Sequence, residues 1–454
     1  MGIVELLPVF MFLALAILLF SGYPVAFVLG GVGLFFGLIG IYYEVFNLIE
    51  FFNIISRIWG GVCENLILVA IPMFIFMGTM LEKSGVAKDL LYALQIMLRR
   101  VPGGLALSVT IMGTIMAATT GIIGASVVMM TLLALPVMLE RSYDKSLATG
   151  TIAASGTLGI LIPPSIMLVI MADLLAISVG TLFVASVLPG LLLAVLYFIY
   201  LFLRTRFNPS LAPPLPDEIG PVNNKEKIAM IFKSFLPPIF LITLVLGSIF
   251  AGIATPTEAA GVGAIGSILL AILNKRLKFK VLKEVVERSA LTGAMIFGIF
   301  VGATAFSYVF RSLGGDDLIH HFVSELGFGP WGILFIMMGL VFLLGFFFDW
   351  IEITLIVLPL FAPIMKTLDF GGHVSPELII PWIAVLLAVN LQTSFLTPPF
   401  GFALFYMKGV SPPEVKIQTI YKGIIPFVIL QLIGLALVIR FPEIALWLPG
   451  RILD

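Results

Sequence analysis

The stretch GTLGILIPPSIM, Gly156 to Met167, decides the fold, and QTSFLTPPFGFAL, Gln392 to Leu404, is its counterpart. Each places two adjacent prolines, with hydroxyls and glycines beside them, inside an apolar run that otherwise resembles a membrane helix. Proline lacks a backbone N–H and its ring clashes with the preceding turn, so each pair predicts a break in a helix. The pairs Pro163-Pro164 and Pro398-Pro399 lie 235 residues apart.

The composition places the chain in a membrane. Of its 454 residues, 60% are hydrophobic and 11% are charged, whereas about a quarter of the residues of a soluble domain are charged. Apolar runs of about 20 residues, long enough to span a bilayer as helices, recur from end to end. The alternating strands of an outer-membrane barrel are absent from the sequence. We therefore expect an all-α polytopic membrane protein.

The apolar runs predict helices over residues 3–20, 24–42, 62–82, 103–119, 124–138, 146–174, 179–203, 234–253, 256–273, 289–311, 330–347, 351–366, 376–407 and 422–441. A further segment, Lys83 to Arg100, has the pattern of an amphipathic helix lying on the membrane surface. The first run has no Lys or Arg before it, so it is predicted to be a retained helix rather than a cleaved secretory signal.

The basic residues indicate which segments cross the membrane. Arg99 and Arg100 precede the helix pair 103–138, and Arg141 and Lys145 follow it, so this pair is predicted to enter and leave on one side. If 103–138 and 330–366 are both re-entrant hairpins, 20 of the 25 Lys and Arg fall on one side, which the positive-inside rule makes cytoplasmic. Both termini then lie outside. The other five basic residues are Arg57, Arg311, Lys366, Arg440 and Arg451.

Other short motifs recur at nearly the spacing of the double prolines. LPVM at Leu135–Met138 matches APIM at Ala362–Met365, and YPVAF at Tyr23–Phe27 matches TPTEA at Thr255–Ala259. These matches predict two repeated units of opposite orientation, joined by the proline-rich segment from Arg204 to Lys227. Inverted repeats with broken helices are typical of secondary transporters, whose sites lie where the broken elements meet.

A break exposes backbone groups at membrane depth, which is tolerable where they line a cavity and bind a ligand. Carbonyls and hydroxyls suit a hard cation such as sodium, and the amides at a helix start suit an anion. The alternative is a proline kink that only shapes packing.

The sequence resembles the large membrane subunit of the tripartite ATP-independent periplasmic (TRAP) transporters, the DctM-like family. The resemblance covers almost the whole chain and rests on IPMFIFMGTMLEKSG (Ile71–Gly85), LGILIPPSIM (Leu158–Met167), SVLPGLLLA (Ser186–Ala194), GIATPTEAAGVGA (Gly252–Ala264), LGFFFDW (Leu344–Trp350) and QTSFLTPPFGFALFYMKGV (Gln392–Val410). It implies two inverted repeats with two re-entrant helical hairpins and two broken helices, in an elevator-type ion-transporter fold.

The resemblance also implies a division of the chain into scaffold and transport domain. Repeat 1 would supply scaffold helices and an amphipathic arm (1–100), then a hairpin, a broken helix and a closing helix (101–204). A cytoplasmic linker (205–232) would lead to the same two parts of repeat 2 (233–329 and 330–454).

The function implied by the resemblance is sodium-driven uptake of a small organic acid anion across the bacterial inner membrane. A periplasmic binding protein would deliver the substrate, and a small DctQ-like membrane subunit would be the second partner. No nucleotide is expected, since the sequence lacks a GxxxxGK[ST] phosphate loop. No nucleic-acid partner and no enzymatic activity are expected either.

The candidate sodium ligands lie at the predicted tips and breaks. The set comprises Thr120, Gly121, Ser155, Gly156, Thr157, Asp349, Thr393 and Ser394. The first tip reads ATTGIIGAS, and Ile122 and Ile123 stand where the family usually has hydroxyls. A first ion site could therefore use side chains or only backbone carbonyls.

The candidate substrate-binding residues are Arg311, Asp349, Ser165 and Thr397. An ionisable group at membrane depth is costly and usually functional, and Asp349 matches the hairpin aspartate of the family. Each candidate also has a simpler interpretation. Asp349 could cap the following helix, Arg311 could extend its guanidinium to the membrane interface, and the hydroxyls could bond back to their own helices.

Three other functions stay open on the sequence alone. The first is a sodium- or proton-coupled carboxylate carrier that needs no binding protein. The second is an intramembrane enzyme, although no Ser–His pair and no second aspartate beside Asp349 are evident. The third is a channel, which duplicated broken helices suit less well than they suit alternating access.

Overall fold

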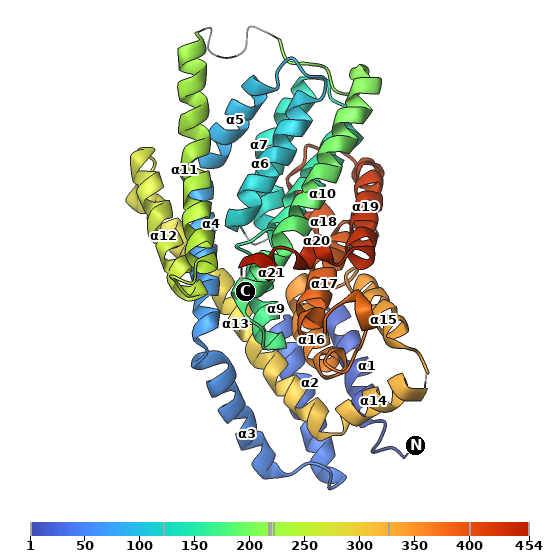
Figure 1. Cartoon of the computed structure of the whole chain (residues 1–454). Helices are drawn as coiled ribbons and strands as arrows, with labels where there is room; N and C mark the ends of the chain where they lie inside the picture. Colours follow the sequence, from blue (N-terminus) through green and yellow to red (C-terminus); the bar gives the residue numbers. More distant parts are fainter. Residues whose placement is uncertain are drawn as a thin grey trace.

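The structure, a computed structural model, describes residues 2–120, 123–216, 220, 223–325, 327–398 and 401–452. All regular structure in these ranges is helical (Figure 1). Nine helical segments of the described chain are long and apolar enough to cross a membrane. The expectation of an all-α polytopic membrane protein is confirmed.

The first half of the chain forms ten α-helices. They are α1 (Leu7–Phe20), α2 (Val25–Tyr42), α3 (Leu48–Ile58), α4 (Ala70–Lys83), α5 (Val86–Met97), α6 (Gly104–Thr120), α7 (Ile123–Glu140), α8 (Lys145–Thr157), α9 (Ile166–Leu175) and α10 (Val179–Phe207). A π-helical segment, Trp59–Cys63, and a 3-10 segment, Leu66–Val69, connect α3 to α4.

The second half follows a similar order and ends in two short helices. They are α11 (Asn224–Phe250), α12 (Pro256–Leu273), α13 (Phe279–Ser312), α14 (Gly315–Glu325), α15 (Pro330–Leu344), α16 (Trp350–Met365), α17 (Ile379–Leu396), α18 (Phe402–Val410), α19 (Ile417–Arg440), α20 (Glu443–Leu446) and α21 (Pro449–Ile452). The single long helix α13 stands where the first half has α3 and α4. Because α10 reaches Phe207 and α11 begins at Asn224, the helices extend into both ends of the predicted linker.

Four helices were not predicted from the sequence, and two of them, α20 and α21, have only four residues each. The segments α3 and α14 have 11 residues each, too few to give the membrane-length apolar run on which the helix prediction relied. Local signals identify α3, because Asn47 and Glu50 form a capping box at its start. The predicted amphipathic segment after Lys83 is present as α5, which packs against α6 and α11.

The first hairpin enters and leaves on one side. Gly103, just before α6, donates its backbone N–H to the carbonyl of Ala212 at 2.9 Å, and Asp144, just after α7, donates its own to Leu211 at 2.8 Å. Both ends of the α6–α7 pair therefore contact the same segment after α10. The prediction of a re-entrant pair is confirmed.

The second hairpin opens in the opposite direction. The ring of Trp331, at the start of α15, lies 5.0 Å from the rings of Phe370 and His373, which follow α16. His373 Nε2 also lies 2.8 Å from the carbonyl of Ile439, at the end of α19. The start of α19 lies instead beside the start of α8. The two hairpins thus open toward opposite ends of α19.

Pro163-Pro164 lies within one break and Pro398 within the other, while Pro399 lies outside the described residues. The first broken helix ends as α8 at Thr157, continues as a 3-10 turn to Ile160, and resumes as α9 at Ile166. The second ends at Leu396 and resumes as α18 at Phe402. The sequence therefore located both breaks correctly.

The helix contacts have the symmetry of an inverted repeat. Helix α2 packs along α13, and the reciprocal pair is α4 with α12. In the same way α9 packs on α16 and α18 on α7, while α8 packs on α19 and α17 on α10. The counterpart of α2 in the second half is α12, and the counterpart of α4 is α13. Replacing both helices of one contact by their counterparts therefore gives the other contact of the same pair. Figure 1 shows α4 beside α12 and α2 beside the lower part of α13.

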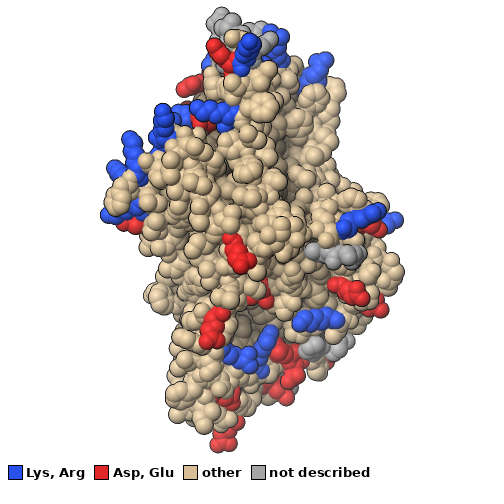
Figure 2. Space-filling model, turned by 60° about the vertical axis from the view of Figure 1, so that its left-hand side comes forward, with Lys and Arg blue, Asp and Glu red and all other residues tan. Residues whose placement is uncertain are grey.

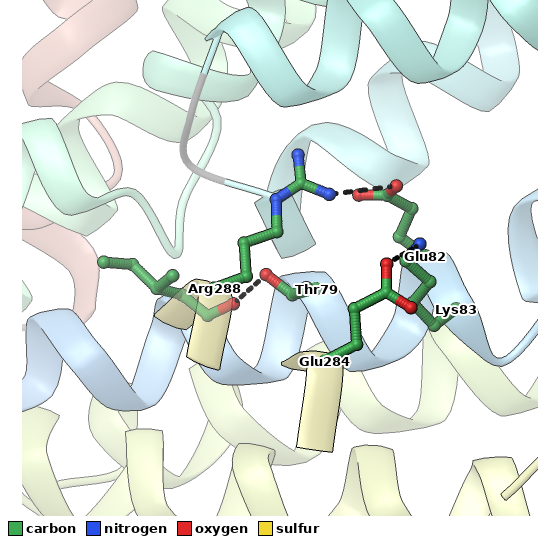
Figure 3. A network of polar contacts seen from close by, with 6 residues as sticks. Thr79, Glu82, Lys83, Glu284 and Arg288 are labelled. Carbon is green, nitrogen blue, oxygen red and sulfur yellow. Dashed lines mark hydrogen bonds and ion pairs between the residues drawn. The ribbon is translucent and has the colours of Figure 1, made fainter. Parts of the chain in front are cut away.

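Ion pairs join α4 to α13 near the end of α4. Lys83 Nζ lies 2.5 Å from Glu284 Oε1, and Arg288 Nη1 lies 3.5 Å from Glu82 Oε1 (Figure 3). The cation is on α4 in the first pair and on α13 in the second. Sliding either helix along the other would therefore separate opposite charges. Gly85, with a φ of +78°, then turns the chain into α5. The ion pairs thus fix the point from which α5 departs.

The two ends of the molecule differ in charge. Figure 2 shows most of the Lys and Arg of this face over its upper half, and most of the Asp and Glu over its lower half. The upper end is where α10 ends and α11 begins in Figure 1. By the positive-inside rule this is the end predicted to face the cytoplasm.

The glycine contact between α8 and α19 gives a test of the packing. A Cβ added at Gly423 would lie 2.1 Å from the carbonyl oxygen of Ser146, which is backbone and cannot turn aside. We expect Gly423→Ala to destabilise the protein by ~1–3 kcal/mol, as overpacking does. Gly261→Ala, also in a membrane helix but with no atom within 4 Å of the added Cβ, is the control. Thermal unfolding in detergent measures both, and equal unfolding temperatures would refute the contact.

Candidate functional site

The tip of the second hairpin carries an acidic cap. Asp349 precedes α16, and its carboxylate accepts a hydrogen bond from the backbone N–H of Trp350 at 2.8 Å. The Glu352 carboxylate accepts one from the backbone N–H of Asp349 at 3.1 Å, which completes a capping box. The capping role considered for Asp349 is therefore present. A carboxylate has about four lone-pair sites on its two oxygens, so the cap leaves some of them available to a ligand.

The broken helix α17 presses against this tip. A Cβ added at Gly345 would lie 2.1 Å from Cβ of Ser394 and 2.2 Å from its Oγ. Only glycine permits so close an approach, which explains why the hairpin has one at this point. Ser394 and the second hairpin tip are thus in direct contact, as predicted.

The hydroxyls of the second break bond back to their own helix. Thr393 Oγ1 donates to the carbonyl of Val389 at 3.4 Å, Ser394 Oγ to that of Leu391 at 2.9 Å, and Thr397 Oγ1 to that of Thr393 at 2.7 Å. The simpler interpretation of these residues is therefore part of the structure. It does not exclude ion binding, since a donating hydroxyl keeps its lone pairs for a cation.

The first break has the same character. Thr157 Oγ1 donates to the carbonyl of Ala154 at 2.9 Å, and Ser165 Oγ donates to that of Ile160. Ser155 Oγ instead reaches across to Thr110 Oγ1 of α6 at 3.3 Å. All three hydroxyls are fully buried.

The first hairpin packs closely against both broken helices. A Cβ added at Gly156 of α8 would lie 2.6 Å from a methyl carbon of Val127 in α7, and one added at Gly124 would lie 3.1 Å from the Tyr406 ring of α18. Gly121 and the side chain of Thr120 lie outside the described residues, so their predicted role as ion ligands stays a prediction.

Two amides that were not among the predicted site residues join this region. Asn390 Nδ2 donates to the carbonyl of Met338 in α15 at 2.7 Å. Asn390 lies 235 residues after Ser155, so equivalent positions tie each broken helix to the first helix of its own hairpin.

The second amide, Gln392, is fully buried, and neither its Nε2 nor its Oε1 has a partner among the described residues. An unpaired buried amide is costly, which marks this position for a polar ligand. The signal available in the sequence was a glutamine inside an apolar helix, one residue before Thr393.

Arg311 lies elsewhere, in a polar cavity of about 940 Å³. Its Nη2 donates to the carbonyl of Pro359 on α16 at 2.7 Å. Since Pro359 follows Asp349 by ten residues on a helix that rises 1.5 Å per residue, the two positions are about 15 Å apart. The structure therefore separates Arg311 from the hairpin tip. Two basic residues that were not among the predicted site residues, Arg57 and Lys366, line the same cavity.

Comparisons with known proteins agree on one family. The family model described as "Tripartite ATP-independent periplasmic transporter, DctM component" matches residues 12–444. The chain is 30% identical to the C4-dicarboxylate TRAP transporter large permease protein DctM of Pseudomonas aeruginosa, covering 85% of this chain and 87% of that protein. It is 26% identical to the ectoine TRAP transporter large permease protein TeaC of Halomonas elongata, covering 95% and 96%.

Two further similarities are informative. The isethionate TRAP transporter permease protein DctMQ of Oleidesulfovibrio alaskensis is 30% identical over 84% of this chain, which spans 58% of that protein. Among solved structures, the Alcanivorax borkumensis YdaH transporter superposes with a TM-score of 0.62 at 14% identity, covering 89% of this chain and 90% of that one. The second similarity concerns the fold alone.

A double substitution tests the contact at the second tip. Gly345→Ala should lower the unfolding temperature, because its Cβ meets Ser394. Ser394→Gly removes the Cβ and Oγ that the added Cβ of Gly345→Ala would meet. The double variant Gly345→Ala with Ser394→Gly should therefore recover much of the lost unfolding temperature. Ser394→Ala keeps the Cβ and should recover little. Thermal unfolding of the three variants and of the double variants measures this coupling. Additive effects of Gly345→Ala and Ser394→Gly would contradict the contact.

Proposed function

The chain belongs to the DctM component family of the tripartite ATP-independent periplasmic transporters, and on that premise we propose that it carries out sodium-coupled uptake of a small organic acid anion. It is a subunit of a membrane transporter, since its curated relatives are named as permeases. The observation that carries the proposal is the convergence of broken helices and hairpin tips. There Ser394 touches Gly345, and Gln392 lies buried with no partner among the described residues.

The proposed ion sites lie beside the two breaks. Around the second break, the hydroxyls of Thr393 and Ser394 and the carboxylate of Asp349 would supply the hard oxygen ligands that sodium prefers. Ser155, Gly156 and Thr157 offer hydroxyls and carbonyls at the first break, and Thr120 and Gly121 complete this set. A bound cation would also compensate the negative charge of Asp349 at membrane depth.

The proposed substrate is an anion. The relatives are named for C4-dicarboxylates, ectoine and isethionate, and each of these compounds bears an acidic group. We propose that Ser165 and Thr397 bond to the substrate near the breaks and that Asp349 contacts it through a bound ion or water, because a bare carboxylate would repel an anion. Arg311 would meet the substrate in the outer cavity, away from the tips.

The proposed cycle is of the elevator type, in the bacterial inner membrane. The paired helices α2, α4, α12 and α13 would form the static scaffold, and the hairpins with their broken helices would move. A periplasmic binding protein would supply the substrate. A small DctQ-like subunit would support the scaffold. The name DctMQ of the isethionate relative, together with its greater length, is consistent with such a second subunit.

The sodium proposal is tested by uptake into proteoliposomes that hold both membrane subunits and receive the binding protein. Thr393→Ala and Ser394→Ala should each raise the sodium concentration needed for half-maximal uptake severalfold, with less effect on the substrate concentration needed. Thr149→Ala and Ser267→Ala remove buried, back-bonded hydroxyls away from the tips and serve as controls. Unchanged sodium dependence in both test variants would exclude these residues. Equal uptake without binding protein would favour an independent carrier.

The role of Asp349 is tested by Asp349→Asn, which keeps the shape and the cap but removes the charge. Asparagine caps a helix as well as aspartate does, so a capping role alone leaves uptake nearly normal. We expect a loss of about tenfold or more, or about 1.4 kcal/mol, at limiting sodium. Asp144→Asn, at the cap of α8, is the matched control. Normal uptake by Asp349→Asn would assign the residue to capping only.

A further inference from the structure

The outer cavity holds an excess of basic residues. Of the five Lys and Arg that the topology places outside, Arg57, Arg311 and Lys366 line it. Asp173 is the one acidic residue in the described lining, and its Oδ1 accepts a hydrogen bond from Asn65 Nδ2 at 2.7 Å. A concave site lined mostly by one sign of charge concentrates ions of the other sign.

Two of these cations have no acidic partner in the part of the chain that the structure describes. The Arg57 guanidinium lies over the ring of Tyr308, 5.1 Å from its centroid, and this contact orients it while leaving its N–H groups available. Neither Arg57 nor Lys366 has a described carboxylate within 4.0 Å, and both are exposed. An anion entering the cavity therefore need not displace an existing ion pair to reach either of them.

Arg311 is held by contacts that an anion could replace. Pro363 has no N–H, so the Pro359 carbonyl one turn earlier lacks its usual helical partner, and Arg311 Nη2 donates to it instead. Its Nε lies 3.7 Å from Asp316 Oδ2, an ion pair in which both side chains are partly exposed. Such a pair contributes little stability. A guanidinium has five N–H donors, so Arg311 can also bind a carboxylate or sulfonate.

We propose that this cavity is an outer binding site for small organic anions, separate from the hairpin tips, in which Arg57, Arg311 and Lys366 hold the acidic group of a substrate before it reaches the tips. The inference rests on the proposed uptake of an anion. The cavity volume of about 940 Å³ is that of a site for a small ligand. The lining joins α13 of the proposed scaffold to the outer half of α16 of the second hairpin, so an anion here would contact both.

Charged labelling reagents test the site without knowledge of the substrate. The exposed Cys63 is first replaced by serine, and Ser307→Cys then places a thiol in the cavity lining. The measured quantity is the rate of labelling by an anionic methanethiosulfonate divided by the rate with a cationic one. This ratio should be about tenfold higher at Ser307→Cys than at Ser375→Cys, which lies outside the cavity. Combining Arg57→Gln with Lys366→Gln should bring the two ratios together, whereas Arg440→Gln, another outer arginine, should not.

Competition identifies the ligand. The assay uses the full membrane complex in sodium-free buffer, so that ion-dependent binding at the tips does not contribute. Millimolar succinate should slow the labelling of Ser307→Cys but not that of Ser375→Cys, and Arg311→Gln should abolish this protection. Labelling rates at Ser375→Cys and the elution profile of the complex confirm that each variant is folded.

Three outcomes would overturn the inference. The first is a ratio at Ser307→Cys equal to that at Ser375→Cys. The second is a raised ratio that the combined Arg57→Gln and Lys366→Gln variant leaves unchanged. The third is protection by the binding protein but not by succinate, which would make the cavity a protein-docking surface. Loss of sodium dependence in uptake would refute the proposed function but would not change these labelling ratios, so the two failures are distinguishable.

Discussion

The constraint on which the rest of the structure depends is that backbone N–H and C=O groups within a membrane need partners. Pro163-Pro164 and Pro398-Pro399 remove that pairing in the middle of two helices. Lipid offers no donors or acceptors, so a broken helix is tolerable only if protein or a polar ligand surrounds it. The two hairpins meet this requirement, since each broken helix is tied to the first helix of its own hairpin, through Ser155 and through Asn390.

Enclosing the breaks determines much of the remaining packing. Each broken helix needs close neighbours, and glycines allow them, as at Gly345 beside Ser394 and at Gly423 beside Ser146. The same arrangement is built twice, and the halves interlock because α9 packs on the hairpin of the second unit and α18 on that of the first. The ion pairs between α4 and α13 join the helices outside this region. The broken helices and hairpins thus form one closely packed group, and ion pairs hold together a second group of helices outside it.

The two hairpins differ at the end away from their tips. Helix α7 has one internal proline, Pro136, whereas α16 has Pro359 and Pro363 one turn apart. The Pro359 carbonyl, left without its helical partner, accepts a hydrogen bond from Arg311. Inverted repeats supply the same scaffold to both sides of the membrane. Differences of this kind give the outer side a basic cavity that the symmetry of the fold does not require.

The sequence by itself determined the membrane class, the two breaks, the two hairpins and the inverted repeat, because apolar length, proline and the distribution of Lys and Arg are local or additive properties. It also placed Ser394 beside the second tip, where the structure shows it against Gly345, while its role as an ion ligand stays a prediction. It missed α3, α14, α20 and α21, which are too short to be recognised by hydropathy, although the capping box at Asn47 could have identified α3. Only the tertiary structure separated Arg311 from Asp349 and grouped Arg57 and Lys366 with Arg311. It also showed that Gln392 has no partner among the described residues. Those relations depend on which helices pack together and at what depth in the membrane their residues meet. Residues far apart in the chain contain no local signal of such contacts.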